Sequence, residues 1–109
     1  MGLNESVESL CEGIREFKNV QFLYGDETEP RLFMPLVVYY ASSSKDDILV
    51  SGVQTFNPYE TWDRTHKAFE VNKISEVELI DIGFEVAYEF SSHGEAFKHG
   101  VICAVDRLS

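Results

Sequence analysis

Residues 3–24 read LNESVESLCEGIREFKNVQFLY and contain the change of hydrophobic period that decides the fold. In the first part, apolar side chains recur at offsets that place them on one helix stripe: Leu3, Val7, Leu10, Cys11, Ile14 and Phe17. From Val20 to Tyr24 the apolar residues instead share a face with period two, as in a half-buried strand. The sequence therefore predicts a helix that ends near Asn19, followed by a β-rich region.

The remaining chain continues in this second period. Alternation predicts strands at residues 32–40, 48–53, 68–71 and 75–79, a longer one-sided strand through Ile80–Phe90, and a last strand or helical turn at 101–105. Both faces of the second strand are apolar, so Pro35 within it implies an edge or a bulge. A shift in the alternation predicts another bulge near Leu79. One helix followed by strands is typical of an α+β fold, here an N-terminal helix packed on a strongly bent antiparallel sheet or a small antiparallel barrel, with an additional C-terminal strand.

Length and charge limit the function. A chain of 109 residues, 44 % of them hydrophobic, is expected to form a single domain over 1–109. A net charge of −10 disfavours binding to double-stranded nucleic acid, and the apolar stretches are too short to span a membrane. Two cysteines, Cys11 and Cys103, make no disulfide framework. We therefore expect both to be small core side chains and the protein to be cytoplasmic.

The sequence contains none of the common catalytic motifs and only one possible metal-binding combination. The chain has no Gly-x-Ser-x-Gly, Walker, Gly-x-Gly-x-x-Gly or His-Glu-x-x-His motif. The one soft-metal combination is His93, His99 and Cys103, whose spacing matches no standard zinc pattern, so a surface loop with two incidental histidines is the better interpretation. We expect a protein without enzymatic activity, cofactor or metal.

Aromatic and basic residues gather between residues 56 and 73. They are Phe56, Tyr59, Trp62, Arg64, His66, Lys67 and Lys73. Aromatic faces beside cations suit stacking on a base or on a flat anionic ligand. Alternatively, Tyr59 and Trp62 pack over an open end of the barrel while the cations neutralise Glu60 and Asp63.

The order of these segments resembles the WYL domain of bacterial regulators. The segments that carry the resemblance are Val20-Gln21-Phe22-Leu23-Tyr24, Arg31-Leu32-Phe33-Met34-Pro35-Leu36, Asp47-Ile48-Leu49-Val50-Ser51-Gly52, Lys67-Ala68-Phe69-Glu70-Val71-Asn72-Lys73-Ile74 and Val77-Glu78-Leu79. The resemblance covers about residues 7–82 and leaves 83–109 as a C-terminal extension. It implies an Sm-like five-stranded barrel that senses nucleic acid fragments or small anionic ligands for a DNA-binding partner domain.

This sequence also departs from the family pattern. The family's Trp-Tyr-Leu is Asp47-Ile48-Leu49 here, and the Arg-rich strand carries Lys67, Glu70 and Lys73. Only a few residues precede the helix, so we expect a stand-alone module without a helix-turn-helix domain in front of it. These departures weaken the ligand-binding face that the family uses.

Four positions match the family's pocket: Tyr24, Arg31, Lys67 and Lys73. The resemblance implies that Tyr24 stacks on the ligand, that Arg31 pairs with an anionic oxygen, and that the two lysines act as point charges. On a regular strand Glu70 points away from Lys67 and would face solvent. The resemblance thus implies a regulatory module for a small anionic or nucleotide-like ligand. The alternative is a protein-interaction or homodimerising module that uses the strand Ile82–Phe90.

Overall fold

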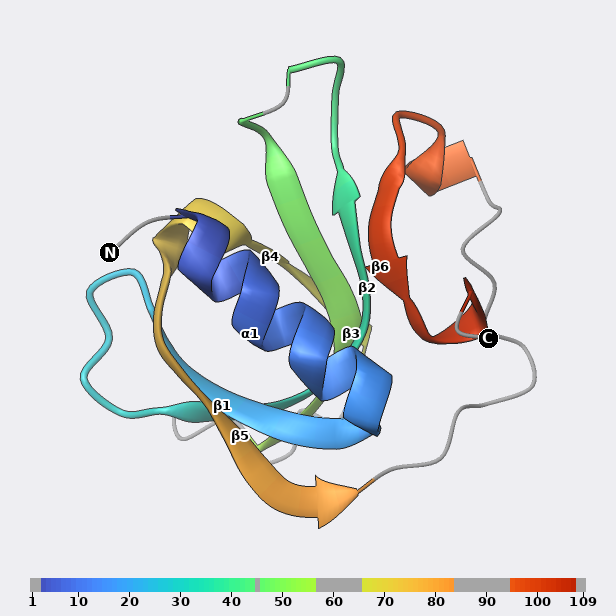
Figure 1. The fold of residues 1–109 in the computed structure, drawn as a ribbon. Coiled ribbons are helices and arrows are strands. Elements are labelled where there is room, and N and C mark those ends of the chain that lie inside the picture. The colour runs from blue at the N-terminus through green and yellow to red at the C-terminus, as the bar shows by residue number, and fades with distance from the viewer. Residues whose placement is uncertain (1–2, 45, 57–65, 84–94, 108–109) are drawn as a thin grey trace.

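The computed structural model describes residues 3–44, 46–56, 66–83 and 95–107 (Figure 1). The helix and strands are α1 (Leu3–Glu16), β1 (Lys18–Tyr24), β2 (Arg31–Tyr40), β3 (Ile48–Phe56), β4 (His66–Glu70), β5 (Ile74–Gly83) and β6 (Val101–Ala104). Three short 3-10 turns complete them: η1 (Val71–Lys73), η2 (Glu95–Phe97) and η3 (Val105–Arg107). The α+β class predicted from the change of period is confirmed.

All strand pairs are antiparallel, and the sheet has the order β4-β3-β2-β1-β5, with β6 paired to β2. The sheet curves strongly, and α1 lies within its hollow side (Figure 1). Among the described strands the sheet is not closed into a barrel, because the two ends of this order, β4 and β5, are joined by η1 and not paired. The Sm-like closure therefore stays a prediction.

The core forms between the helix stripe and the hollow side of the sheet. Leu10 and Ile14 of α1 are fully buried and belong to the same cluster as Phe22, Phe33 and Phe69. The three rings pack edge to face with centroid separations of 5.8, 5.2 and 5.2 Å. Such T-shaped pairs stabilise a core beyond the area that they bury. The predicted packing of the helix stripe on the sheet is confirmed.

Strand β2 changes its neighbour at Pro35. On one side, β1 pairs with β2 up to Phe33, and β6 pairs with it from Val37 onward. Pro35 lies between these partners, where the N–H that proline lacks is not needed by either ladder. On the other side, the register with β3 shifts between Pro35 and Val37, so the predicted bulge is confirmed. Gly52 faces Pro35 there, and a Cβ at Gly52 would collide with the carbonyl oxygen of Met34.

Strand β5 contains two irregularities where it pairs with β1. Its partner residues jump from Gly83 to Leu79 while β1 advances by two, which confirms the predicted bulge near Leu79. A second shift lies between Glu78 and Ser75 and includes Glu76, whose φ is 52°. The one-sided strand predicted as far as Phe90 is described only to Gly83, so its remainder lies outside the described residues.

A disulfide joins Cys11 of α1 to Cys103 of β6, with 5.9 Å between their Cα atoms. Cys11 is buried in the core, as its place on the helix stripe predicts. The expectation that both cysteines act as unpaired side chains is wrong, because spacing along the chain says nothing about partners 92 residues apart. The predicted cytoplasmic location can therefore no longer be based on unpaired thiols, and it stays a prediction.

Residues 95–107, the described part of the segment set aside as an extension, contribute to the core. Ala104 and Val105 are buried, and Val105 joins the cluster under α1. Phe97 packs edge to face on Tyr39 of β2, with 4.7 Å between the ring centroids.

In the described part of the chain, no helix combines the length and apolar character that crossing a membrane requires.

Candidate functional site

The candidate site lies around Phe69, where the curl of the sheet brings together strands that are far apart in its order. Phe69 belongs to β4 at one end of the sheet, yet its ring centroid lies 4.9 Å from that of Tyr24, the last residue of β1. Arg31 opens β2, and its Cζ lies 5.5 Å from the Phe69 ring centroid. A guanidinium over an aromatic face is an attractive arrangement. Two of the four predicted positions, Tyr24 and Arg31, therefore share Phe69 as a neighbour.

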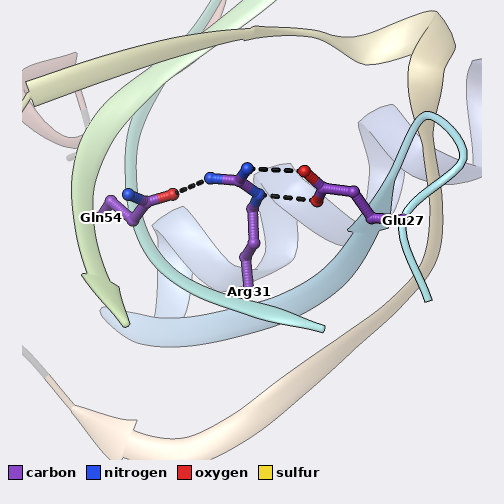
Figure 2. A network of polar contacts seen from close by, with 3 residues as sticks. All are labelled: Glu27, Arg31 and Gln54. Carbon is purple, nitrogen blue, oxygen red and sulfur yellow. Dashed lines mark hydrogen bonds and ion pairs between the residues drawn. The ribbon is translucent and has the colours of Figure 1, made fainter. Parts of the chain in front are cut away.

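Arg31 is held by hydrogen bonds on two sides (Figure 2). Its Nε and Nη2 atoms donate to the two carboxylate oxygens of Glu27 at 2.8 and 2.7 Å, and Nη1 donates to Oε1 of Gln54. Gln54 is fully buried, and only 13 % of the Arg31 side chain is exposed. Bidentate pairing of this kind is both stronger and more directional than a neutral hydrogen bond. The orientation of the guanidinium is therefore fixed.

The turn between β1 and β2 positions Glu27. The Glu27 N–H donates to the carbonyl oxygen of Tyr24 at 3.1 Å, and Gly25 has the positive φ of 60° that this turn needs. The Gly25 N–H also donates to the carbonyl oxygen of Lys73 at 2.9 Å, which ties the turn to η1. The hydrogen bonds from Arg31 hold the pKa of Glu27 below its ordinary value, and the charge of Arg31 adds to this while burial opposes it.

Lys73 reaches the same end of the sheet through Glu70. Its Nζ lies 3.1 Å from a carboxylate oxygen of Glu70, and this contact raises the pKa of Lys73. The hydroxyl of Tyr24 accepts the backbone N–H of Glu70 at 3.1 Å. The strand ends at Glu70 and the 3-10 turn η1 follows, so residues 70 and 73 come together. Glu70 faces solvent, as expected, but the expectation that it would stay clear of both lysines is wrong for Lys73, with which it forms an ion pair.

Lys67 lies on β4 opposite Gly52 of β3, two residues before Phe69 and on the same face of the strand. Its side chain is half-buried. The structure thus gathers Tyr24, Arg31 and Lys73 around Phe69 and Glu70. The contribution of Lys67 to the site stays a prediction.

The other sequence candidates contribute less. Tyr59, Trp62 and Arg64 lie outside the described residues, so neither interpretation of that aromatic segment is tested. His93 also lies outside them, and the sulfur of Cys103 is bonded to Cys11, which leaves no thiolate for a metal. Among the described residues, no group of three His, Cys, Asp or Glu side chains could hold a metal ion.

Two members of the site, Glu27 and Gln54, were not anticipated from the sequence. Gln54 is a polar side chain within the largely apolar run of residues 48–56, and such a residue must find a partner when it is buried. Glu27 stands four residues before Arg31 across a glycine turn, at a distance that a hairpin can close. Both signals are present in the sequence, but neither reveals which partner the side chain takes.

The comparisons with known proteins bear on the fold of the chain. No protein-family model and no curated protein matches the chain. The fold is similar to that of Proteasome accessory factor B/C (PafBC) of Arthrobacter aurescens, with a TM-score of 0.62 and 11 % sequence identity. The likeness covers 95 % of this chain, so it extends beyond residues 7–82, but only 14 % of the PafBC chain. At this identity the likeness concerns the fold alone.

Proposed function

We propose that the chain is a non-enzymatic, WYL-like regulatory module that binds a small anionic or nucleotide-like ligand at Arg31. Two independent lines support the proposal. The order of sequence segments resembles the WYL domain, and the fold is similar to part of PafBC, a regulator that contains a WYL domain. The first rests on side-chain pattern, and the second, at 11 % identity, supports a WYL-like fold and is consistent with a regulatory module.

The observation that carries the proposal is the fixed guanidinium of Arg31. Gln54 orients it from the core, and Phe69 lies beside it. A planar guanidinium held in one orientation matches the two oxygens of a carboxylate or phosphate. The ring of Tyr24, next to Phe69, can offer an aromatic wall to a flat ligand, and the half-exposed Lys73 can add positive charge at the rim.

The charges of the site argue for modest affinity. Arg31 is paired with Glu27, and Lys73 is paired with Glu70, so each cation of this pair already has an acidic partner. An incoming anion therefore exchanges with an internal carboxylate and gains only the difference between the two interactions. The polar groups that the cluster holds are suited to orienting an anion, and we propose binding without catalysis.

The proposal is tested by titrating the protein with 5′-adenosine monophosphate at low salt while amide resonances are followed by NMR. We expect saturable shifts at Tyr24, Arg31 and Phe69, and their loss in Arg31→Gln. The matched control is Lys98→Gln, which also removes one positive charge but belongs to an exposed ion pair with Glu95. Undetectable shifts at millimolar ligand in the folded protein would contradict the proposal.

Because Arg31→Gln changes a largely buried network, its folding is checked by circular dichroism. If that variant does not fold, Lys73→Gln takes its place, because Lys73 is half-exposed and its only role in the proposal is to attract the anion. We then expect weaker ligand binding with an unchanged circular dichroism spectrum. Full retention of binding in folded Arg31→Gln, or in Lys73→Gln where it takes the place of that variant, would contradict a ligand site at Arg31.

A second candidate function, a homodimerising module, is favoured by one observation. Ile82 of β5 is 54 % exposed, and β5 is the last strand of the described sheet order. An apolar side chain on a strand edge can be covered by a second copy that extends the sheet. We propose this as the alternative if no anion binds at Arg31.

A further inference from the structure

We propose that Glu27 is an internal competitor for the ligand: its carboxylate holds the guanidinium edge of Arg31 that a bound oxyanion would take. The ligand then binds only by displacing this carboxylate. This inference rests on the proposed function and adds a mechanism that controls the same site. It also specifies the ligand group as an oxyanion that can present two acceptor oxygens to Nε and Nη2 of Arg31 at the same time.

Each of the three guanidinium nitrogens of Arg31 donates a hydrogen bond in the folded protein. Gln54 accepts from Nη1, and Glu27 accepts from both Nε and Nη2. A carboxylate or phosphate can bind a guanidinium through two parallel hydrogen bonds at the edge of Nε and Nη2 or at the edge of Nη1 and Nη2. Glu27 occupies the first edge, and Gln54 already accepts from Nη1 of the second. Figure 2 shows the two partners on opposite sides of Arg31, so an anion that needs the first edge meets Glu27 there.

Exposure to solvent increases through the network from Gln54 to Arg31 and then to Glu27. The side chain of Gln54 is fully buried, that of Arg31 is 13 % exposed, and that of Glu27 is 25 % exposed. Glu27 is thus the outermost of the three. It also lies in the turn between β1 and β2, whereas Gln54 and Arg31 belong to strands. Glu27 is therefore the member that can leave without disturbing the sheet.

Competition from Glu27 should also make the site selective among anions. A carboxylate on the same chain, four residues from Arg31, competes at the effective concentration of a tethered group. A free monocarboxylate offers Arg31 the same two oxygens and gains nothing over Glu27. A phosphate monoester carries more charge and more acceptor oxygens, so it can replace Glu27 with a net gain. The site should therefore prefer phosphate monoesters to carboxylates.

The test compares Glu27→Gln with Asp26→Asn by calorimetric titration with 5′-adenosine monophosphate, inorganic phosphate and acetate. Both variants remove one negative charge from the same turn, but Asp26 is exposed and outside the Arg31 network. We expect Glu27→Gln to raise the affinity for both phosphate probes about tenfold or more. Asp26→Asn should change it about twofold or less. Acetate should bind measurably only to Glu27→Gln.

Each result has a distinct meaning. Equal affinities of the wild type and Glu27→Gln would overturn the competitor role and leave the proposed function standing. Equal gains in Glu27→Gln and Asp26→Asn would also overturn it, since the effect would then be the charge of the turn. Absence of binding in all folded proteins would contradict the proposed function itself.

If Glu27→Gln fails to fold, Glu27→Asp replaces it. The aspartate keeps the charge, but its carboxylate lies one methylene closer to the backbone and so reaches the Arg31 guanidinium less well. We expect it to raise phosphate affinity by less than the full tenfold, and unchanged affinity would contradict the proposal.

Discussion

The Nη1 group of Arg31 donates a hydrogen bond to the side-chain oxygen of Gln54, although the two residues lie 23 positions apart on neighbouring strands. Gln54 is fully buried, so the bond links a residue at the candidate site directly to the core. No buried side-chain nitrogen or oxygen in the described part of the chain lacks a hydrogen-bond partner. The guanidinium is therefore part of the polar network of the folded core.

This link predicts a stability cost for Gln54→Met, which keeps the side-chain length but removes the acceptor. We expect the free energy of unfolding to fall by about 1–3 kcal/mol, because a charged donor loses its buried partner. Urea denaturation measures the change. Gln21→Met is the matched control, since Gln21 bonds Glu78 on the exposed side of the sheet, and its change should be about 0.5 kcal/mol or less. Equal losses in both variants would contradict the role of Gln54.

The pair of Glu27 with Arg31 predicts a pH dependence of stability. The pKa of Glu27 in the folded protein lies below its ordinary value of 4.5, so the unfolded chain takes up the proton more readily. The contribution of the pair is thus complete above about pH 4.5 and is lost as the pH falls through the lowered pKa. Denaturation curves should show a shallower acid loss in Glu27→Gln than in the wild type or Asp26→Asn. Identical slopes in all three would contradict the pair.

The disulfide predicts a dependence of stability on reductant. It closes a segment of 92 residues between α1 and β6, and its removal should cost about 2–5 kcal/mol. Thermal or urea unfolding with and without dithiothreitol measures this. The double variant Cys11→Ser, Cys103→Ser should have the same stability as the reduced wild type, and reductant should not change its stability. Two titratable thiols per chain in unreduced, denatured protein would contradict the bond.

The exposed Ile82 predicts self-association if the interaction module is the correct function. In that case light scattering should show a dimer at micromolar concentration, and Ile82→Lys should shift it toward monomer. Lysine on an edge strand opposes pairing with another chain. Ser75→Lys, at an exposed neutral position elsewhere on β5, controls for the added charge. A wild type that stays monomeric throughout that range contradicts the homodimer.

The sequence was sufficient for those parts of the fold that follow from local periodicity. The stripe through Leu10 and Ile14 predicted the helix and its buried face, and Pro35 predicted the bulge where β2 changes neighbours. The place of Cys11 in the core also followed from the stripe. Its bond to Cys103 did not, because a contact across 92 residues leaves no periodic signal.

The candidate site was predicted only in part, since its geometry depends on how the sheet curls. The resemblance selected Tyr24 and Arg31, which the structure brings together at Phe69. Counting by twos through residues 67–73 assumed a strand, whereas η1 replaces its second half and pairs Lys73 with Glu70. The acidic partners of the cations are the feature that strand counting could not supply.

The most direct test of a ligand site at Arg31 is the Nε–H resonance of Arg31 in ¹H–¹⁵N spectra during titration with 5′-adenosine monophosphate. In the unliganded protein, the hydrogen bond to Glu27 should give this resonance a chemical shift distinct from that of a solvent-exposed arginine. As phosphate takes the place of the Glu27 carboxylate, we predict that the chemical shift changes saturably. The same titration should leave the amide of Lys98 unmoved. An Arg31 Nε–H resonance that stays fixed at saturating millimolar ligand, in protein that remains folded, would contradict the account.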